Sequence, residues 1–121
     1  MKDLAKDLVI VDPDRVYVVG HSMGGTGANY MVNEEPELFA AAISVAGCSV
    51  EAWRAFRKLP YQLFHAADDG VAAVEGAREL AGKLGRHRTF VYTEFKTGGH
   101  HIARRVFDDP AVRAWLFAQS K

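Results

Sequence analysis

The segment GHSMG at residues 20–24 places a serine between two glycines, directly after a short apolar run, Val-Tyr-Val-Val. A serine on a sharp turn between a buried strand and a helix projects its hydroxyl to where a histidine can reach it. Gly20 and Gly24 are expected to keep the neighbouring backbone clear of a Cβ atom. The amide of Met23, at the start of the helix, can donate to an oxyanion. Ser22 is therefore the candidate nucleophile and Met23 the candidate oxyanion-hole donor.

A serine nucleophile needs a base and an acid that orients the base. Both occur in later loops that follow apolar runs: Asp68 and Asp69 in one, His100 and His101 in another. The order Ser22, Asp69, His100 is the nucleophile, acid and histidine order of one common hydrolase arrangement. We favour Asp69 over Asp68, which is expected to cap a turn. We favour His100, which follows two glycines, over His101, which is expected to face solvent or the following helix.

Other side chains have a structural interpretation, and two of them also have a functional alternative. His21 is expected to make a structural hydrogen bond or to line the substrate pocket, where it would be a substitute oxyanion donor. Trp53 either forms a wall of an acyl pocket or packs in the core. His65 is interpreted as a satisfied core histidine and His87 as a solvated turn residue. Cys48 is expected to be a small buried thiol, because no distinct base is available to activate it.

Composition excludes several classes of function. The chain has 121 residues, interpreted as a single domain over 1–121, with 15 basic and 15 acidic side chains. Without a basic stripe, nucleic acid is not an expected partner. No apolar run approaches the roughly 20 residues of a membrane span, and no signal peptide is recognised, which favours a cytoplasmic protein. The histidines lack metal-ligand spacing, and the glycine-rich run 24–27 lacks the lysine of a phosphate loop, so no metal or cofactor is expected.

The elements that must position these residues alternate along the chain. An alternating order of strands and helices predicts a parallel, right-handed sheet covered by helices, with its site beyond the carboxyl ends of the strands. The expected strands are 15–19, 40–46, 61–65 and 89–95, and the expected helices are 2–10, 22–33, 51–57, 72–84 and one that begins at Asp109-Pro110.

Four segments carry a resemblance to a known family, the last of them the segment 108–117, which resembles that family's closing helix. Residues 12–25 resemble the elbow segment of α/β-hydrolase-fold serine esterases of the phospholipase/carboxylesterase, feruloyl-esterase and prolyl-oligopeptidase-like type. Residues 65–69 resemble that family's His-Gly-x-x-Asp segment, with the acid at Asp69, and residues 98–100 match its histidine loop. In this sequence Ala66 stands in place of the family's glycine. The resemblance implies a hydrolase that cleaves small short-chain carboxylic esters through a Ser-His-Asp triad and an acyl-enzyme.

The same resemblance implies a truncated α/β-hydrolase fold of about four parallel strands flanked by helices, corresponding to the C-terminal half of the family's domain. The chain is then either a minimal hydrolase or part of a larger gene product. The edge of the first strand would be exposed, which predicts a homo-oligomer formed through that edge or the N-terminal helix. With one oxyanion amide in place of two, transition-state stabilisation would be weaker by about 3 kcal/mol. The alternative is a non-catalytic or incomplete module that needs a partner chain.

Overall fold

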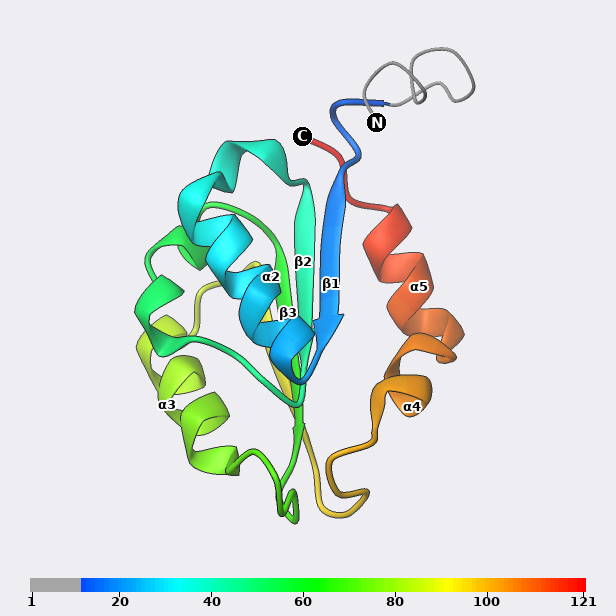
Figure 1. Cartoon of the computed structure of the whole chain (residues 1–121). Helices are drawn as coiled ribbons and strands as arrows, with labels where there is room; N and C mark the ends of the chain where they lie inside the picture. Colours follow the sequence, from blue (N-terminus) through cyan, green and yellow to red (C-terminus); the bar gives the residue numbers. More distant parts are fainter. Residues whose placement is uncertain (1–11) are drawn as a thin grey trace.

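The computed structural model describes residues 12–121 (Figure 1). The expected helix over 2–10 lies outside the described residues. The described chain forms one sheet in which every strand pair is parallel, with the order β1-β2-β3-β4. The strands are β1 (Tyr17–His21), β2 (Ala41–Val45), β3 (Tyr61–Ala66) and β4 (Phe90–Phe95). The carboxyl ends of all four strands therefore lie at the same edge of the sheet.

Helices cover the sheet on both faces (Figure 1): α2 and α3 on one side, α4 and α5 on the other. The helices are α2 (Met23–Glu34), α3 (Val74–Leu84), α4 (Ala103–Phe107) and α5 (Pro110–Phe117). Short 3-10 turns lie at Pro36–Leu38, Val50–Ala52 and Ala55–Arg57. α5 begins with Pro110 at its first position, and the carboxylate of Asp109 accepts a hydrogen bond from the Ala111 amide.

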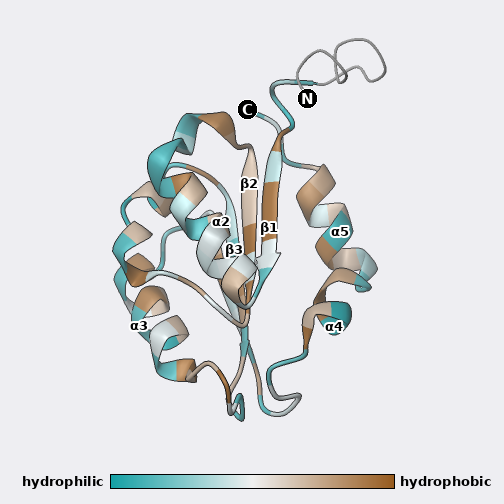
Figure 2. Cartoon of the chain, in the orientation of Figure 1, coloured by the Kyte–Doolittle hydropathy of each residue, from teal (hydrophilic) through white to brown (hydrophobic). Residues whose placement is uncertain are grey.

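The two central strands are buried along their whole length, because each face meets its own layer of helices. Successive side chains of a strand point to opposite faces. Tyr61 and Leu63 accordingly belong to the core under α2 and α3, whereas Phe64 and Ile43 belong to the core under α4 and α5. Figure 2 shows apolar residues along the strands and hydrophilic residues on the outer turns of the helices.

The predicted fold class, four parallel strands flanked by helices, is confirmed. The first strand begins two residues later than expected, since Asp12 closes a turn with the amides of Asp14 and Arg15 (2.9 and 3.1 Å). The expected helix over 51–57 is wrong: two separate 3-10 turns occupy this segment. The sequence analysis also missed α4, which has only five residues and so is too short for helical periodicity to identify.

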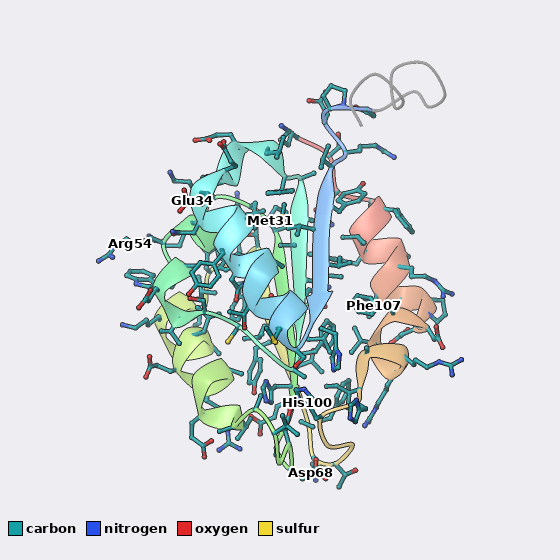
Figure 3. All side chains as sticks on the ribbon, viewed as in Figure 1. Met31, Glu34, Arg54, Asp68, His100 and Phe107 are labelled. Carbon is teal, nitrogen blue, oxygen red and sulfur yellow. The ribbon has the colours of Figure 1, made fainter. Side chains whose placement is uncertain are left out.

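β1 is an edge strand. It pairs with β2 on one side, and no strand within residues 12–121 pairs with its other side. Beside it, α2 carries the exposed side chains of Tyr30 and Met31, which line a surface groove together with Leu38. Figure 3 labels Met31 on this helix. Homo-oligomer formation through this edge stays a prediction. Over the described part of the chain, none of the helices has the length and apolar character needed to cross a membrane.

Candidate active site

Ser22 occupies the turn between β1 and α2 with a backbone conformation that is unusual for a residue with a side chain. Its φ is 60° and its ψ is −120°, a strained region for a non-glycine residue. Neighbouring backbone holds the turn: the Ser22 amide donates to the Val45 carbonyl (2.8 Å), and the Ser22 carbonyl accepts from the Gly25 amide (2.9 Å). The strand end and the first turn of the helix therefore fix the orientation of the serine.

Close backbone approach demands glycine at three positions around this turn. A Cβ on Gly20 would overlap the Gly24 carbonyl, and one on Gly47 would overlap the Ser22 carbonyl. A Cβ on Gly25 would lie 2.5 Å from the Gly47 carbonyl oxygen. Gly24, by contrast, has open space where a Cβ would be. The expectation for Gly24 is therefore wrong, because Gly25 is the residue at which α2 approaches the loop after β2.

Ser22, His100 and Asp69 come together in one hydrogen-bonded chain, although they follow three different strands. Ser22 Oγ lies 2.7 Å from His100 Nε2, and His100 Nδ1 donates to Asp69 Oδ2 at 2.9 Å. Figure 3 labels His100 beyond the end of β1, between the two helical layers. With Nδ1 protonated and bound to a carboxylate, Nε2 is the nitrogen that can accept the serine proton.

The Asp69 carboxylate is enclosed, and its side chain is 0% exposed. Its Oδ1 atom accepts hydrogen bonds from the amides of Val71 and Ala72, each 2.8 Å long. Burial by itself raises the pKa of Asp69, but the hydrogen bond from His100 and the two amide hydrogen bonds outweigh it, so the pKa lies below its ordinary value. Asp69 is therefore a carboxylate at neutral pH and has the charge needed to orient a histidine.

The loop that carries His100 is anchored by two of the residues whose roles were open. Asp68 accepts hydrogen bonds from the amides of Gly99 (2.8 Å) and Gly98 (3.3 Å). Both glycines have positive φ, 66° and 131° respectively. His21 Nε2 donates to the His100 carbonyl at 2.8 Å, which is the structural hydrogen bond considered for it. Asp68 was expected to cap a turn, and the turn whose amides it binds is that of the histidine loop.

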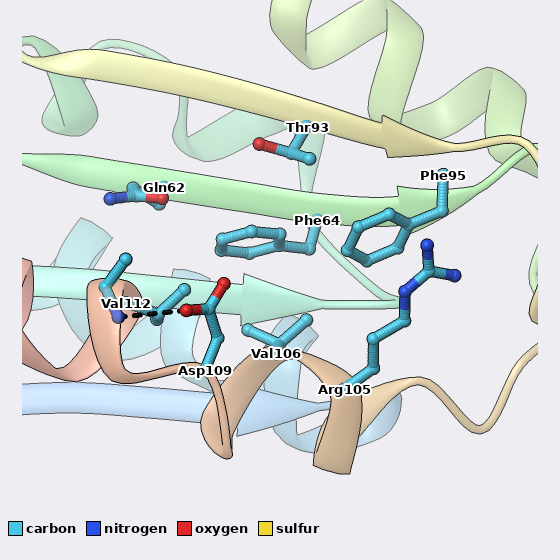
Figure 4. Close-up of a pocket in the computed structure, with 9 residues that line it drawn as sticks. Gln62, Phe64, Thr93, Phe95, Arg105, Val106, Asp109 and Val112 are labelled. Atoms are coloured by element: carbon cyan, nitrogen blue, oxygen red, sulfur yellow. Dashed lines mark hydrogen bonds between the residues drawn. The ribbon is translucent and has the colours of Figure 1, made fainter.

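Arg105 is a third anchor of this loop, and the sequence analysis did not identify it. Its guanidinium donates to the Thr97 carbonyl (3.0 Å) and lies 3.8 Å from the centre of the Phe95 ring. Figure 4 shows Arg105 reaching from α4 towards Phe95, at one end of a groove of about 220 Å³ between the strands and α4–α5. Ser22 and His100 do not line this groove.

Met23 is the first residue of α2, and its side chain is 87% exposed. The first amides of a helix have no carbonyl partner within it, so the Met23 amide is available to donate a hydrogen bond, and its role as the oxyanion donor stays a prediction. Trp53 is not brought into this group. It packs against the core beside α2 and α3, with the charged ends of Arg54 and Lys83 4.7 and 5.7 Å from its ring.

The remaining candidates are accounted for by packing. Burial, with a smaller contribution from Glu79, raises the pKa of Cys48 to about 11, which keeps it a neutral thiol. His87 lies in the turn after α3 and is partly exposed. His65 is buried, as expected, but its hydrogen bonds are not all made: among the described residues, its Nδ1 atom has no hydrogen-bond partner. Within residues 12–121, no three histidine, cysteine or acidic side chains are grouped to hold a metal ion.

Known proteins resemble the chain in sequence and in fold. The sequence profile of the prolyl oligopeptidase family matches residues 1–77. A thermostable esterase of known structure is 34% identical over 99% of the chain, with a TM-score of 0.88. The chain spans about a third of that esterase, 35% of its length. None of the curated proteins compared with the chain matches it.

Two more distant structures share the fold. The acylaminoacyl peptidase of Pyrococcus horikoshii is 18% identical, with a TM-score of 0.70 over 86% of this chain and 23% of its own. Acyl-protein thioesterase 2 of Zea mays is 19% identical, with a TM-score of 0.68 over 97% of this chain and 62% of its own. At these identities the likeness shows the fold alone. All three solved structures share with this chain the parallel, helix-covered sheet of the α/β-hydrolases.

Proposed function

The chain belongs to the prolyl oligopeptidase family, and from this premise we propose that it is a serine hydrolase that cleaves small short-chain carboxylic esters. One observation carries the proposal: Ser22 Oγ, both nitrogens of His100 and Asp69 Oδ2 form a continuous chain with distances of 2.7 and 2.9 Å. Nucleophile, base and orienting acid are the three groups that acyl transfer by serine requires.

In the proposed reaction, Ser22 Oγ attacks the acyl carbon while His100 Nε2 takes the hydroxyl proton. The Met23 amide donates to the oxyanion that forms on the former carbonyl oxygen. As the intermediate collapses, the bond to the alcohol breaks and His100 delivers its proton to the leaving oxygen. Water then attacks the acyl-enzyme with His100 as the base, which releases the acid and restores Ser22. Asp69 stays ionised and stabilises the charged imidazole in both steps.

Small substrates are proposed because the side chains that flank the site are exposed. Met23 follows the serine and is 87% exposed, and Val71 follows the acid and is 76% exposed. A site this exposed encloses little of a long acyl chain, so most of the chain stays in water and its length adds little binding energy. The likeness to a thermostable esterase supports an ester as the substrate.

A second candidate function is an α/β-hydrolase module that turns over substrate only with a partner chain. Two observations favour it. The outer edge of β1 has no strand partner among the described residues, and the chain spans 35% of the esterase to which it is similar. In this case the serine is activated by His100, but a second oxyanion donor comes from another polypeptide.

Hydrolysis of p-nitrophenyl acetate and butyrate by the purified chain separates the two candidates. The proposal predicts turnover that Ser22→Ala abolishes and that Ser120→Ala, at an exposed serine near the C-terminus, leaves unchanged. Acetate and butyrate should be better substrates than a long-chain ester such as the palmitate. Absence of turnover in the folded wild-type chain would contradict a self-sufficient esterase and favour the module that needs a partner.

A further inference from the structure

His65 is a buried histidine of β3 that faces two hydrogen-bond acceptors with the same nitrogen. It is 2% exposed. Its Nε2 atom lies 2.8 Å from the Ala72 carbonyl oxygen and 3.3 Å from Asp69 Oδ2. A carbonyl and a carboxylate supply no proton, so an unprotonated Nε2 would set its lone pair against both. Nε2 therefore carries a hydrogen, which it donates to the Ala72 carbonyl.

The other nitrogen of the ring is in the opposite situation. Nδ1 of His65 is enclosed, and none of the residues described by the structure gives it a hydrogen-bond partner. A hydrogen on Nδ1 would be a buried donor without an acceptor, which costs more than an unused lone pair. The surroundings of the two nitrogens together select the neutral ring with its hydrogen on Nε2.

This ring is connected to both oxygens of the Asp69 carboxylate. Ala72, whose carbonyl His65 binds, donates its own amide to Asp69 Oδ1 at 2.8 Å. Oδ2, which lies 3.3 Å from His65, is the oxygen that accepts from His100 at 2.9 Å. His65 thus fixes the loop segment at Ala72, whose amide binds Asp69 Oδ1. The same ring also faces Oδ2, the oxygen that orients His100. Because the ring is neutral, it leaves the negative charge of Asp69 available to the imidazolium that forms on His100.

Three titratable side chains lie around His65. Asp69 faces it from the loop, His100 shares the Oδ2 atom, and Glu94 lies opposite it in the register of β4. Glu94 is already paired with Arg78, whose guanidinium approaches both carboxylate oxygens at 2.8 and 2.9 Å. Asp69 is therefore the carboxylate that the Nε2–H group of His65 faces directly.

We propose that His65 is a positioning residue of the active site: a neutral Nε2–H imidazole that fixes the Asp69 loop through Ala72 and keeps Oδ2 turned towards His100. The proposal rests on the proposed function for its effect on turnover, but not for its structural content. The tautomer and the state of the Asp69–His100 hydrogen bond are both measurable in the absence of substrate.

The tautomer is tested first on the wild-type chain. Long-range ¹H–¹⁵N correlation spectra at neutral pH distinguish the two neutral tautomers and the charged ring, with the signals of His65 assigned by their loss in His65→Gln. The expected result is a neutral ring with its hydrogen on Nε2. A hydrogen on Nδ1, alone or in an imidazolium, would overturn the proposal.

The positioning role is tested with a matched pair of variants. A glutamine at 65 can place an amide N–H near the position of Nε2, whereas leucine fills the site without a donor. We expect His65→Gln to keep kcat near the wild-type value. We expect His65→Leu to lower kcat about 10- to 100-fold, as a small misplacement of a catalytic group does, with KM changed less than about twofold because no substrate contact is lost. The downfield Nδ1 proton of His100 should shift only in the leucine variant.

Three outcomes would decide against the proposal or against the proposed function. A folded His65→Leu chain with wild-type kcat would overturn the positioning role, and so would a glutamine variant as impaired as the leucine variant. If His65→Leu does not fold, the wild-type tautomer decides. If no form of the chain hydrolyses esters but fluorophosphonate labelling of Ser22 is slowed only by leucine, the proposed function fails and the role of His65 stands.

Discussion

The side chain of His21 donates a hydrogen bond of 2.8 Å from Nε2 to the backbone carbonyl of His100. The residue directly before the candidate nucleophile therefore holds the loop that presents the candidate base. The two rings also lie 5.2 Å apart, centre to centre. This contact joins the end of β1 to the loop after β4, at opposite edges of the sheet. It makes the position of His100 relative to Ser22 depend on the residue that precedes the serine.

Replacement of His21 should therefore reduce turnover without removing a reacting group. We expect His21→Leu to lower kcat about tenfold or more, because the His100 loop loses one of its anchors. His21→Gln, whose amide can donate to the same carbonyl, should lose much less. Steady-state kinetics on p-nitrophenyl acetate measure both variants. Equal losses in the two variants would show that the hydrogen bond to His100 is not what His21 contributes.

The two adjacent acids should behave very differently when each becomes an amide. Asp69→Asn removes the charge behind His100 and favours the wrong tautomer of its ring, which costs about 10⁴-fold in kcat in a serine triad. The Gly98 and Gly99 amides bind different oxygens of Asp68, and Asp68→Asn keeps one of these two acceptors, so we expect kcat to fall less than about tenfold. The reverse order of the two variants would assign the acid to Asp68.

The lowered pKa of Asp69 links this residue to stability at acid pH. Because its pKa is lower in the folded than in the unfolded chain, its ionised form contributes stability at pH values above the unfolded-state pKa of about 3.9. That contribution is lost as the pH falls through the folded-state pKa. The difference in the free energy of unfolding between wild type and Asp69→Asn should therefore shrink below about pH 4. Urea unfolding from pH 7 to pH 3 measures it, and a constant difference would contradict the assigned shift.

The two glycines that follow Met23 provide a matched test of the elbow. Gly25→Ala would set a methyl group against the Gly47 carbonyl oxygen, and we expect a loss of about 1–3 kcal/mol in the free energy of unfolding, as for other overpacked sites. The methyl group added by Gly24→Ala would lie in open space, so this variant should change the free energy of unfolding by about 1 kcal/mol or less. Thermal unfolding compares the variants. A stable Gly25→Ala chain would mean that α2 approaches the Gly47 loop less closely.

Much of the fold was predictable because its signals are local. Apolar runs bounded by glycine, proline and acidic residues located all four strands within two residues at each end. The turn at Ser22 and the loops that carry Asp69 and His100 were also recognisable from local sequence. The parallel sheet then brings these three residues to one edge. Their roles in catalysis stay predictions, as does self-association.

The features that sequence analysis missed depend on contacts between distant segments. Whether Gly24 or Gly25 must be glycine depends on how the loop after β2 passes α2. Asp68 binds backbone amides 30 and 31 residues away and Arg105 a backbone carbonyl 8 residues away, and neither type of residue signals such a partner in advance. The unequal hydrogen bonding of the two ring nitrogens of His65 likewise depends on the residues packed around it. Only a signal for pairing between loops would have identified these residues.

The central claim is that His100 and Asp69 activate Ser22, and covalent labelling tests it most directly. A fluorophosphonate probe should modify the wild-type chain once, at Ser22 by mass mapping, at a rate that His100→Ala lowers strongly and Ser120→Ala leaves unchanged. Labelling that is absent in the folded wild-type chain, that falls on another serine, or that is indifferent to His100 would contradict the account.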